Sequence, residues 1–330
     1  MAARTIASRA LLLEPGAHWK HKMVMTAAKL DLFSFLAGGA RDAAAVAAHY
    51  QGNVRAFELF LNALAGLRLL EKRQGLYRNS RFAARRLVRG RKDYRGDQLV
   101  IDDLFWGLWG ELETALRTGR APQSASIFRA DPEAAQRLIL GLHHDALKIA
   151  PDLAQRLPLE GCQALLDLGG GAGTYAIAFC QRYPGLRATV FDLPTVTGTT
   201  RSLIAQQGLQ DRIQVVDGDF TTDPLPKDND VVFMSNVLHS SGPDDNQRLL
   251  RKVSDVLNAG GRVIVRDVVM DADLASPPFG AVFAVYMLLH TPEGRCYAFD
   301  EIAGWLDQAG FGEIETLEPN AVLTARKKDR

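Results

Sequence analysis

The chain has 330 residues, of which 47% are apolar and 23% are charged. This length and composition suit one large domain plus a smaller one, and they exclude a mostly disordered chain. The 39 basic side chains nearly balance the 38 acidic ones, so the net charge by itself would not attract nucleic acid or a membrane. Three cysteines without a C-x-x-C pair are too few for a disulfide framework, which favours a reducing, cytoplasmic compartment.

Neither apolar run of the sequence has the length of a targeting or membrane segment. The run from Leu11 to Leu13 is too short for a signal peptide. The stretch FGAVFAVYMLL, which begins at Phe279, is far below the length of a membrane span. We therefore expect a soluble protein with no membrane partner.

Residues 27–89 have a helical pattern and then a briefly strand-like one. AAKLDLFSFLAG, DAAAVAAHY and VRAFELFLNALAGLRLL are helical in pattern, and Gln74 and Gly75 then separate two short extended pieces, as a hairpin turn does. Five apolar residues recur at helical spacing and predict one buried face: Phe57, Leu59, Phe60, Leu64 and Leu67. Helices followed by a hairpin predict a winged-helix domain, which we place at residues 1–98.

The region 68–96 is locally basic. It holds eleven Arg or Lys residues against only Glu71 and Asp93. A DNA-binding wing could use such an excess. The alternative interpretation is a solvated face.

Residues 99–160 are expected to be helical and to link two domains. The block FWGLWGELETAL begins at Phe105 and brings Phe105, Trp106 and Trp109 close together. The next helix is expected to open with Asp131 as N-cap and Pro132 at its first position.

From Gln163 onward, short β-rich runs alternate with amphipathic segments. The runs are ALLDLG, RATVFDL, RIQVVDGD, DVVFMSNVL and GRVIVRDVV. This alternation predicts an α/β domain with a parallel sheet and helices on both faces, at residues 161–330. The helix between the last two runs is expected to start near Asp244 or Asp245 and to stop at Gly260 and Gly261. The tail, IETLEP and then AVLTARK, predicts a terminal antiparallel hairpin.

A glycine turn follows the first of these strands. The strand ends at Asp167, and Gly169, Gly171 and Gly173 form a sharp turn into a helix where the backbone can approach a ligand closely. Dinucleotide enzymes use G-x-G-x-x-G at this place, but Thr174 occupies the third glycine position here. An acid two residues before the first glycine suits a ligand with a cationic amino-acid tail.

Two further strand ends extend this site. Asp192 ends the second strand, where a carboxylate can accept both hydroxyls of a ribose. Asp219 and Phe220, at the end of the third strand, could contact the amino group and the ring of an adenine. The residues at the ends of these three strands together favour an adenosyl ligand. The alternative is that the three aspartates only cap turns.

These motifs resemble those of a known family. LLDLGGGAGT, the Asp192-Leu193-Pro194 strand end, VDGDF and DVVFMSNVLH together resemble the class I O-methyltransferases. The likeness is greatest to bacterial relatives of the plant caffeate and animal acetylserotonin O-methyltransferases, over essentially the whole chain. It implies a Rossmann-like sheet of seven strands and an N-terminal winged helix that forms a homodimer and binds no nucleic acid.

The resemblance also implies S-adenosylmethionine as the cofactor. The cofactor-binding residues it implies are Asp167, Gly169, Gly171, Gly173, Asp192, Leu193, Asp219, Phe220 and Ser235.

His239 matches the family's catalytic histidine, a general base for a hydroxyl proton. Asp267 matches the place of a plant glutamate that fixes the imidazole tautomer. Two positions depart from the plant pattern: Ser240 and Ser241 replace an Asp-Trp pair, and Cys296 replaces a second glutamate beside the base. Cys296 is expected in the pocket wall.

The resemblance further implies a pocket for a flat, apolar small-molecule acceptor. Its expected lining is Trp106, Trp109, Leu142, His143, His144, Phe283, Tyr286, Met287, Cys296 and Tyr297, with Phe105 and Phe279 nearby. Adjacent residues on a helix diverge, so at most one of His143 and His144 should face the pocket. The histidines have no known zinc-motif spacing, and no metal is expected.

We therefore expect an S-adenosylmethionine-dependent O-methyltransferase that acts on a hydroxyl of an aromatic or polyketide-like molecule. Two alternatives stay open. The acceptor atom could be nitrogen, sulfur or carbon, or the sulfonium could serve non-methylating chemistry. Less expected is a winged-helix regulator that senses a ligand.

Overall fold

The computed structural model describes residues 16–121, 128 and 131–328. The chain forms two compact units, residues 1–107 and 108–330. The three-part division expected from the sequence, with boundaries after residues 98 and 160, stays a prediction. The apolar run from Leu11 to Leu13 lies outside the described residues.

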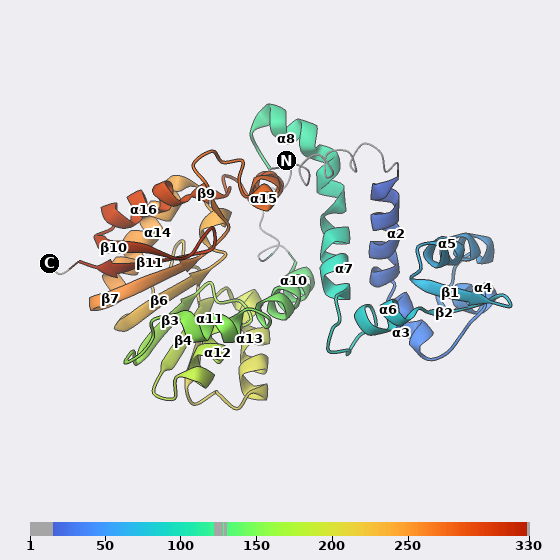
Figure 1. Ribbon diagram of the computed structural model, residues 1–330, viewed down its shortest axis with the longest axis horizontal. Helices are drawn as coiled ribbons and strands as arrows, with labels where there is room; N and C mark the ends of the chain where they lie inside the picture. Colours follow the sequence, from blue (N-terminus) through green and yellow to red (C-terminus); the bar gives the residue numbers. More distant parts are fainter. Residues whose placement is uncertain (1–15, 122–127, 129–130, 329–330) are drawn as a thin grey trace. The chain divides into compact units, whose positions relative to one another are not determined.

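Helices and one short hairpin build the first unit (Figure 1). Its elements are α2 (Ala17–Lys29), α3 (Leu32–Ala37), α4 (Ala43–His49), α5 (Val54–Gly66), β1 (Leu70–Arg73), β2 (Leu76–Asn79), α6 (Arg81–Arg86) and α7 (Gly96–Phe105). β1 and β2 pair antiparallel, and φ is positive at both turn residues, 48° at Gln74 and 79° at Gly75. Positive φ at both positions is typical of tight hairpin turns, so the predicted hairpin is confirmed.

Polar side chains begin three helices of this unit. Asp42, Asn53 and Ser80 accept the backbone N–H three residues further on, at 2.7, 3.0 and 3.3 Å. Each bond satisfies an amide that has no partner inside its helix. The buried core of the unit includes Phe33, Leu61, Leu64, Leu70 and Tyr77.

Two lysines of α2 reach a buried carboxylate of α7, and the two helices lie side by side in Figure 1. The carboxylate of Asp103 on α7 meets the ammonium groups of Lys22 and Lys29 on α2, at 2.5 and 2.9 Å. Burial raises the pKa of Asp103, but the hydrogen bonds and charges of the two lysines outweigh burial and hold it below its usual value. The ionised carboxylate therefore fixes one helix against the other.

Two details of the helical pattern differ from expectation. AAKLDLFSFLAG is interrupted, because α2 ends at Lys29 and Asp31 has a φ of 53° before α3 begins. The expectation that Leu59 is buried is wrong, since its side chain is 58% exposed. Leu61 is buried instead, and two residues separate the faces of a helix by about 200°.

The second unit contains one large sheet with flanking helices. Its helices are α8 (Leu112–Thr118), α10 (Pro132–Ala146), α11 (Ala150–Arg156), α12 (Thr174–Arg182), α13 (Pro194–Gln206), α14 (Pro243–Val256), α15 (Pro278–His290) and α16 (Phe299–Gln308). Its strands are β3 (Ala164–Leu168), β4 (Arg187–Asp192), β5 (Ile213–Asp217), β6 (Asn229–Ser235), β7 (Leu257–Arg266), β8 (Val269–Met270), β9 (Tyr297–Ala298), β10 (Phe311–Glu318) and β11 (Val322–Lys327). The short 3₁₀ segment η1 (Trp106–Glu111) crosses the boundary between the units.

The large sheet has seven strands in the order β10-β11-β7-β6-β3-β4-β5. The strands from β3 to β7 are parallel, and β10 and β11 form the antiparallel hairpin predicted for the tail. The chain order reverses at β3, which lies between β4 and β6. In open α/β sheets, ligands bind at the carboxyl ends of the strands at such a reversal.

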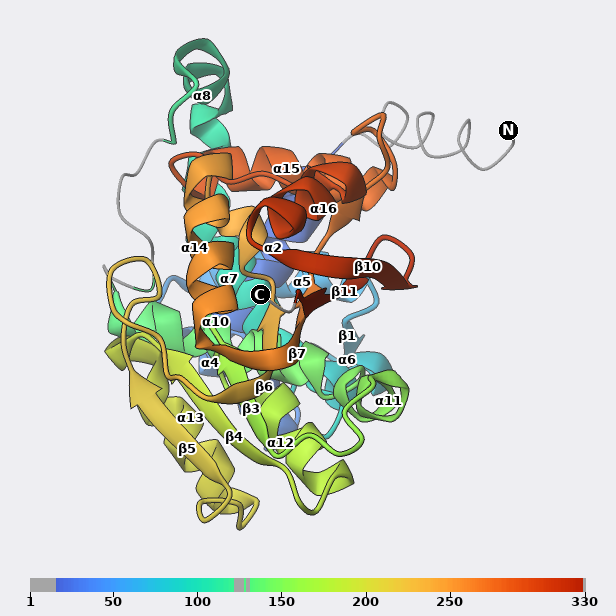
Figure 2. The same ribbon diagram turned by 90° about the vertical axis from the view of Figure 1, so that its left-hand side faces the viewer.

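Helices cover both faces of the sheet (Figures 1 and 2). Leu166 and Leu168 of β3 face the side of α14 and α16, whereas Leu165 faces the side of α11, α12 and α13. This alternation along one strand confirms the predicted sheet with helices on both faces. Among the described residues, none of the helices combines the length and the apolar character that crossing a membrane requires.

One predicted helix end in this unit is wrong. The helix expected to start near Asp244 or Asp245 and to stop at Gly260 and Gly261 is α14, which starts close to the expected place, at Pro243, but ends already at Val256. Gly260 and Gly261 lie instead in β7, at an irregularity in its pairing with β6. A glycine with positive φ, here 67° at Gly260, suits a bulge as well as a helix end.

Candidate active site

The turn from β3 into α12 contains three glycines in the left-handed region. Their φ values are 65° at Gly169, 56° at Gly171 and 69° at Gly173. Residues with a Cβ rarely adopt such values, whereas glycine does so readily. Gly170 is required for another reason, since a Cβ there would lie 2.7 Å from Cγ of Asp167. The glycines thus present bare backbone at the carboxyl end of β3.

Asp167 is fully buried under this turn. Its Oδ2 accepts the N–H of Ala176 at 3.3 Å, and its Oδ1 has no hydrogen-bond partner. Burial raises the pKa of this carboxyl to about 7, although the Ala176 N–H favours the ionised form. A buried oxygen without a partner is destabilising, so a cationic group such as an ammonium fits this place.

Asp192 is the last residue of β4 and holds the glycine turn. Its Oδ2 accepts the N–H of Gly171 and its Oδ1 that of Leu193, both at 2.7 Å. Burial raises the pKa of Asp192, and these two bonds offset part of that effect. Each carboxylate oxygen can accept a further hydrogen bond, so the hydroxyls of a ribose can still be received.

Asp219 and Phe220 follow β5, which stops earlier than expected, at Asp217. Asp219 makes a local turn in which its Oδ1 accepts the N–H and the hydroxyl of Thr221, at 2.9 and 2.6 Å. Phe220 reaches the glycine turn, because a Cβ on Gly169 would lie 3.6 Å from its ring. The aromatic side chain therefore borders the expected nucleoside site, whereas one oxygen of Asp219 is engaged in its own turn.

His239 and Asp267 come together after two neighbouring strands. His239 lies in the 3₁₀ turn η2 (Leu238–Ser240), which follows β6, and Asp267 follows β7. Nδ1 of His239 is 2.6 Å from Oδ1 of Asp267, and both side chains are buried. Asp267 also accepts the backbone N–H groups of Leu238, His239 and Val268 at 3.0, 3.3 and 2.7 Å.

These contacts define the state of the pair. Burial raises the pKa of Asp267, but the charge and hydrogen bond of His239, with the backbone amides, hold it below its usual value. An ionised Asp267 accepts the Nδ1–H of His239, so Nε2 carries the lone pair. The arrangement can therefore take a proton at Nε2.

The turn that contains the serines replacing the plant Asp-Trp pair is held by Asn246, which the sequence did not reveal as functional, and by Tyr297, which was expected to line the acceptor pocket. Asn246 of α14 is fully buried and donates to the carbonyls of Leu238 and Ser241 at 2.9 and 3.3 Å. The Tyr297 hydroxyl also donates to the Ser241 carbonyl, at 2.5 Å. The available signal for Asn246 is its place on the buried face of an amphipathic helix.

Gly294 packs against the backbone of the histidine turn. A Cβ at this position would lie 2.3 Å from the carbonyl oxygen of His239 and 2.4 Å from Oγ1 of Thr291. No local pattern around Gly294 predicts this approach, because its partner is 55 residues away in the chain. The space beside His239 therefore requires glycine at position 294.

A row of rings on α15 borders His239. The Phe283 ring lies 5.0 Å from the imidazole at 85°. Phe279, Phe283, Tyr286 and His290 stack in sequence, with centroids 5.7, 5.6 and 3.7 Å apart and nearly parallel planes. The structure thus places the expected acceptor contacts Phe283 and Tyr286 together, and Phe283 lies directly against His239.

Other expected acceptor contacts lie in different surroundings. Trp109 approaches Tyr286, with ring centroids 6.4 Å apart. Met287 and Cys296 are buried, and Tyr297 packs its ring on Trp305 at 4.7 Å inside the core between the sheet and α16. Their roles toward an acceptor stay predictions.

The predicted helix that opens at Asp131 and Pro132 is confirmed as α10, and Asp131 caps it by accepting the N–H of Ala134 at 3.0 Å. α10 packs over the glycine turn, because Cδ1 of Ile139 would meet a Cβ on Gly171 at 3.3 Å.

The three expected contacts on α10 have distinct positions. His143 places Nδ1 2.7 Å from the hydroxyl of Thr174, the first residue of α12. Its ring centroid lies 5.8 Å from that of His144, and the Leu142 side chain is 42% exposed.

The expected acceptor contact Trp106 belongs to the first unit. The ammonium of Lys22 lies 5.4 Å from the centre of its ring.

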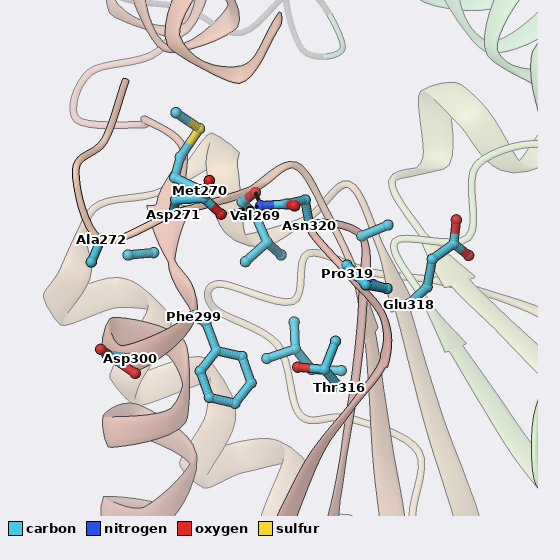
Figure 3. Close-up of a pocket in the computed structure, with 13 residues that line it drawn as sticks. Val269, Met270, Asp271, Ala272, Phe299, Asp300, Thr316, Glu318, Pro319 and Asn320 are labelled. Carbon is cyan, nitrogen blue, oxygen red and sulfur yellow. Dashed lines mark hydrogen bonds between the residues drawn. The ribbon is translucent and has the colours of Figure 1, made fainter. Parts of the chain in front are cut away.

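A separate cavity of about 340 Å³ lies beside β8, the start of α16 and the β10–β11 hairpin (Figure 3). Phe299, Asp300 and Thr316 are among its lining residues, and the Asn320 amide donates to the Val269 carbonyl at 3.0 Å. None of the residues expected to bind a cofactor or to catalyse lines this cavity. It is therefore distinct from the site at the glycine turn.

The fold and the site together define a transferase that uses a nucleoside cofactor. The site suits a ligand with an adenosyl group and a cationic amino-acid tail. The unpartnered oxygen of Asp167 suits the cation, while the glycine turn, Asp192 and the ring of Phe220 suit the adenosyl group. His239 and Asp267 follow β6 and β7, the next two strands along the sheet from β3, and Nε2 of His239 can accept a proton there. S-adenosylmethionine has both the adenosyl group and the cationic tail.

Comparison with known families identifies the class directly. The model of the O-methyltransferase domain matches residues 109–312, and that of the O-methyltransferase dimerisation domain matches residues 15–89. The chain belongs to the O-methyltransferase family.

Individual relatives agree with this assignment. The chain is 34% identical to 3-hydroxy-5-methyl-1-naphthoate 3-O-methyltransferase of Streptomyces sahachiroi, covering 91% of this chain and 88% of the relative. It is 32% identical to the tetracenomycin polyketide synthesis 8-O-methyl transferase TcmO of Streptomyces glaucescens, covering 94% of each. The structure of human N-acetylserotonin methyltransferase in complex with SAM matches with a TM-score of 0.83 and 26% identity, over 98% of both chains. S-adenosylmethionine is the cofactor of this enzyme.

Proposed function

We propose that this enzyme methylates a hydroxyl of a planar aromatic or polyketide-like small molecule, with His239 as general base and Asp267 as its positioning partner. The observation that carries the proposal is the 2.6 Å contact between Nδ1 of His239 and Oδ1 of Asp267. It aims a proton-accepting Nε2 away from the carboxylate. A hydroxyl is a weak nucleophile until its proton is removed, so the acceptor needs such a base.

The ring row on α15 supports a planar acceptor. Phe283 lies nearly parallel to Phe279 and Tyr286, with ring centroids 5.7 and 5.6 Å apart, so the row offers a series of aligned, offset rings. Aromatic rings pair favourably in offset-stacked or edge-to-face arrangements, which suits a planar aromatic acceptor. The names of two relatives refer to a hydroxynaphthoate acceptor and to the synthesis of the polyketide tetracenomycin.

The chain's residues would act mainly by position. When bound, S-adenosylmethionine supplies an electrophilic methyl group. Asp192 and the glycine turn hold the nucleoside end, while Phe283 and its neighbours hold the acceptor plane. Holding reactants in line accounts for much of the rate in such displacements. Nε2 of His239 takes the hydroxyl proton, and ionised Asp267 stabilises the imidazolium that forms.

Cys296 is a pocket-wall residue in this account. Burial raises the pKa of its thiol to about 12, and the negative charge of Asp267 adds to the effect. A thiol that stays protonated is a poor nucleophile. The place of the second plant glutamate is therefore occupied by an inert group, and Asp267 alone orients the base.

The enzyme is proposed to work as a homodimer through its first unit. The match of residues 15–89 to the family's dimerisation domain supports this assembly. Trp19 and Leu104 carry exposed apolar surface on α2 and α7, at 62% and 46% exposure. Apolar surface of this kind is typical of association sites.

The test uses purified enzyme, S-adenosylmethionine with a labelled methyl group, and a panel of hydroxynaphthoates and tetracyclic phenols. We expect labelled product from at least one phenol, and we expect His239→Ala to lower kcat by about 10²- to 10⁴-fold. The affinity for S-adenosylhomocysteine should stay unchanged in this variant. His49→Ala, in the first unit, is the matched control. Undiminished turnover by His239→Ala would contradict the proposed base.

A further inference from the structure

Arg266 ends β7 at the same edge of the sheet as the glycine turn. It pairs in register with Ser235, the last residue of β6, and its Nη1 donates to the Ser235 hydroxyl at 3.3 Å. The side chain is half-buried. It lies on the α12 face of the sheet, because side chains alternate along the strand and Ile264 of β7 packs on that face.

Tyr175 connects Arg266 with Asp167. Tyr175 is buried at the start of α12, and the guanidinium of Arg266 lies 5.7 Å from its ring centre. The pKa of the Tyr175 phenol is raised above its usual value, mainly by burial. The charge of Arg266 and a hydrogen bond with Ser235 lower this pKa, and the charge of Asp167 raises it further. The phenol therefore lies within reach of both charges.

Arg266 and Asp167 nevertheless make no ion pair with each other. Within residues 16–121, 128 and 131–328, no carboxylate lies within 4.0 Å of the Arg266 guanidinium. Other cations around the sheet are engaged, since Arg201 pairs with Asp217 and Lys252 donates to the Phe220 carbonyl. One face thus holds an arginine without an ion pair and a carboxylate with an unpartnered oxygen.

An α-amino acid carries a cation and an anion on one carbon. Such a group would satisfy Asp167 with its ammonium and an arginine with its carboxylate. Arginine is suited to this contact, because its planar guanidinium donates two parallel hydrogen bonds to a carboxylate. We propose that Arg266 binds the carboxylate of the methionine portion of S-adenosylmethionine, while Asp167 faces its ammonium. The inference depends on the cofactor and not on the proposed acceptor.

His143 is the competing candidate. It lies beside the same turn, with Nδ1 on the Thr174 hydroxyl. Burial, together with the neighbouring His144, lowers the pKa of His143, so the imidazole is neutral near pH 7. A neutral ring attracts a carboxylate less strongly than a guanidinium does.

Calorimetry with two probes tests the proposal: S-adenosylhomocysteine and its decarboxylated analogue, which keeps the amine and lacks the carboxylate. We expect Arg266→Met to weaken S-adenosylhomocysteine binding by about 10- to 100-fold, the effect of losing a charged hydrogen bond. Binding of the decarboxylated analogue should change by less than about threefold, because it lacks the group that Arg266 holds. Arg262→Met, four residues earlier on the same face of β7, is the matched control and should leave both affinities unchanged.

Arg266→Lys keeps the positive charge and should keep part of the preference for the carboxylated probe. It also serves if Arg266→Met fails to fold. Equal weakening of both probes in Arg266→Met would assign a structural role to the side chain and overturn the proposal. Unchanged binding of S-adenosylhomocysteine would overturn it as well. Failure of the wild-type protein to bind S-adenosylhomocysteine would instead refute the cofactor site itself.

Discussion

At the scale of single residues, Asp167 makes the cofactor-free protein sensitive to pH. Its folded-state pKa of about 7 lies above the value near 3.9 of an unfolded chain. A raised pKa contributes stability that is complete below pH 4 and is lost as the pH rises through about 7. We therefore expect the free energy of unfolding, measured by urea titration, to fall between pH 4 and pH 7 by more in wild type than in Asp167→Asn.

The cofactor provides the control for Asp167. A bound ammonium favours the ionised carboxylate, so saturating S-adenosylhomocysteine should reduce the difference in pH dependence between the two proteins. Identical pH profiles for cofactor-free wild type and Asp167→Asn would show that the buried carboxyl does not titrate in this range.

The pKa shift of Asp267 is opposite in direction to that of Asp167. Its pKa is depressed in the folded protein, so its stabilising contribution is present above about pH 4 and is lost as the pH falls through the folded value. Asp267→Asn keeps the shape but removes the acceptor of the Nδ1–H. We expect kcat to fall by about 10²-fold or more, measured across pH, because the imidazolium loses its stabilising charge.

Asp230→Asn is the comparison for this variant. Asp230 also accepts backbone N–H groups, those of Gln163 and Ala164, but it contacts no residue of the proposed active site. It should retain its kcat. Equal losses of kcat in both variants would mean that Asp267 acts through stability alone.

Several of these residues could be predicted from the sequence because they follow strands. Asp167, Asp192 and His239 each stand at or just after the end of a β-rich run, and parallel strands bring such ends to one edge. The contacts of Arg266 and Asn246 could not be predicted this way. Arg266 also ends a β-rich run, but its contacts with Tyr175 and Ser235 involve other elements and leave no local pattern. Asn246 lies in a helix, where its buried position shows that it packs inward but not which carbonyls it contacts.

At the scale of elements, the glycine turn is the feature most sensitive to change. Gly170→Ala would place a Cβ 2.7 Å from Cγ of Asp167 and 2.8 Å from Cγ1 of Val190. Both side chains are buried and have little room to move away. We expect a loss of stability of about 1–3 kcal/mol from overpacking, measured by denaturant titration, together with weaker S-adenosylhomocysteine binding.

Gly185→Ala is its matched control. Gly185 has no positive φ, and a Cβ there would meet nothing within 4 Å. It should therefore leave stability and cofactor binding nearly unchanged. A Gly170→Ala variant as stable as this control would mean that the turn can shift to accept a side chain.

Element boundaries were less predictable than element types. The strands and helices of the second unit follow from hydrophobic periodicity, but the ends of α14 and β5 do not. A glycine such as Gly260 is typical both of a helix end and of a strand bulge, so the sequence alone does not distinguish them. The pairing of β7 with β6 shows that Gly260 lies at a bulge. The Asp219 side chain closes its own turn and so ends β5 two residues early.

At the scale of the whole molecule, the proposed homodimer depends on apolar surface of the first unit. We expect Trp19→Asp or Leu104→Asp to shift the enzyme toward monomer, measured by light scattering after size exclusion, because a charge would be buried in the interface. Leu317→Asp on β10, a partly exposed position of the second unit, is the control and should stay dimeric. A dimer that survives both substitutions would place the interface elsewhere.

The general architecture was predictable because several signals agree. Helices with a hairpin, then alternating strands and helices with a glycine turn, allow few arrangements. The acceptor was not predictable to the same depth. The residues proposed to contact it belong to elements that are distant in sequence, and side-chain packing between such elements leaves little periodic trace.

The most direct test of the central claim is the binding of S-adenosylmethionine to the strand ends. Isothermal titration of the purified enzyme should show one cofactor site per chain. Asp192→Ala should weaken that binding by about 10- to 100-fold, since the ribose hydroxyls lose a charged acceptor. Asp211→Ala, an exposed aspartate outside the site, should bind as wild type does. Absence of binding by the wild-type enzyme, or undiminished binding by Asp192→Ala, would contradict the account.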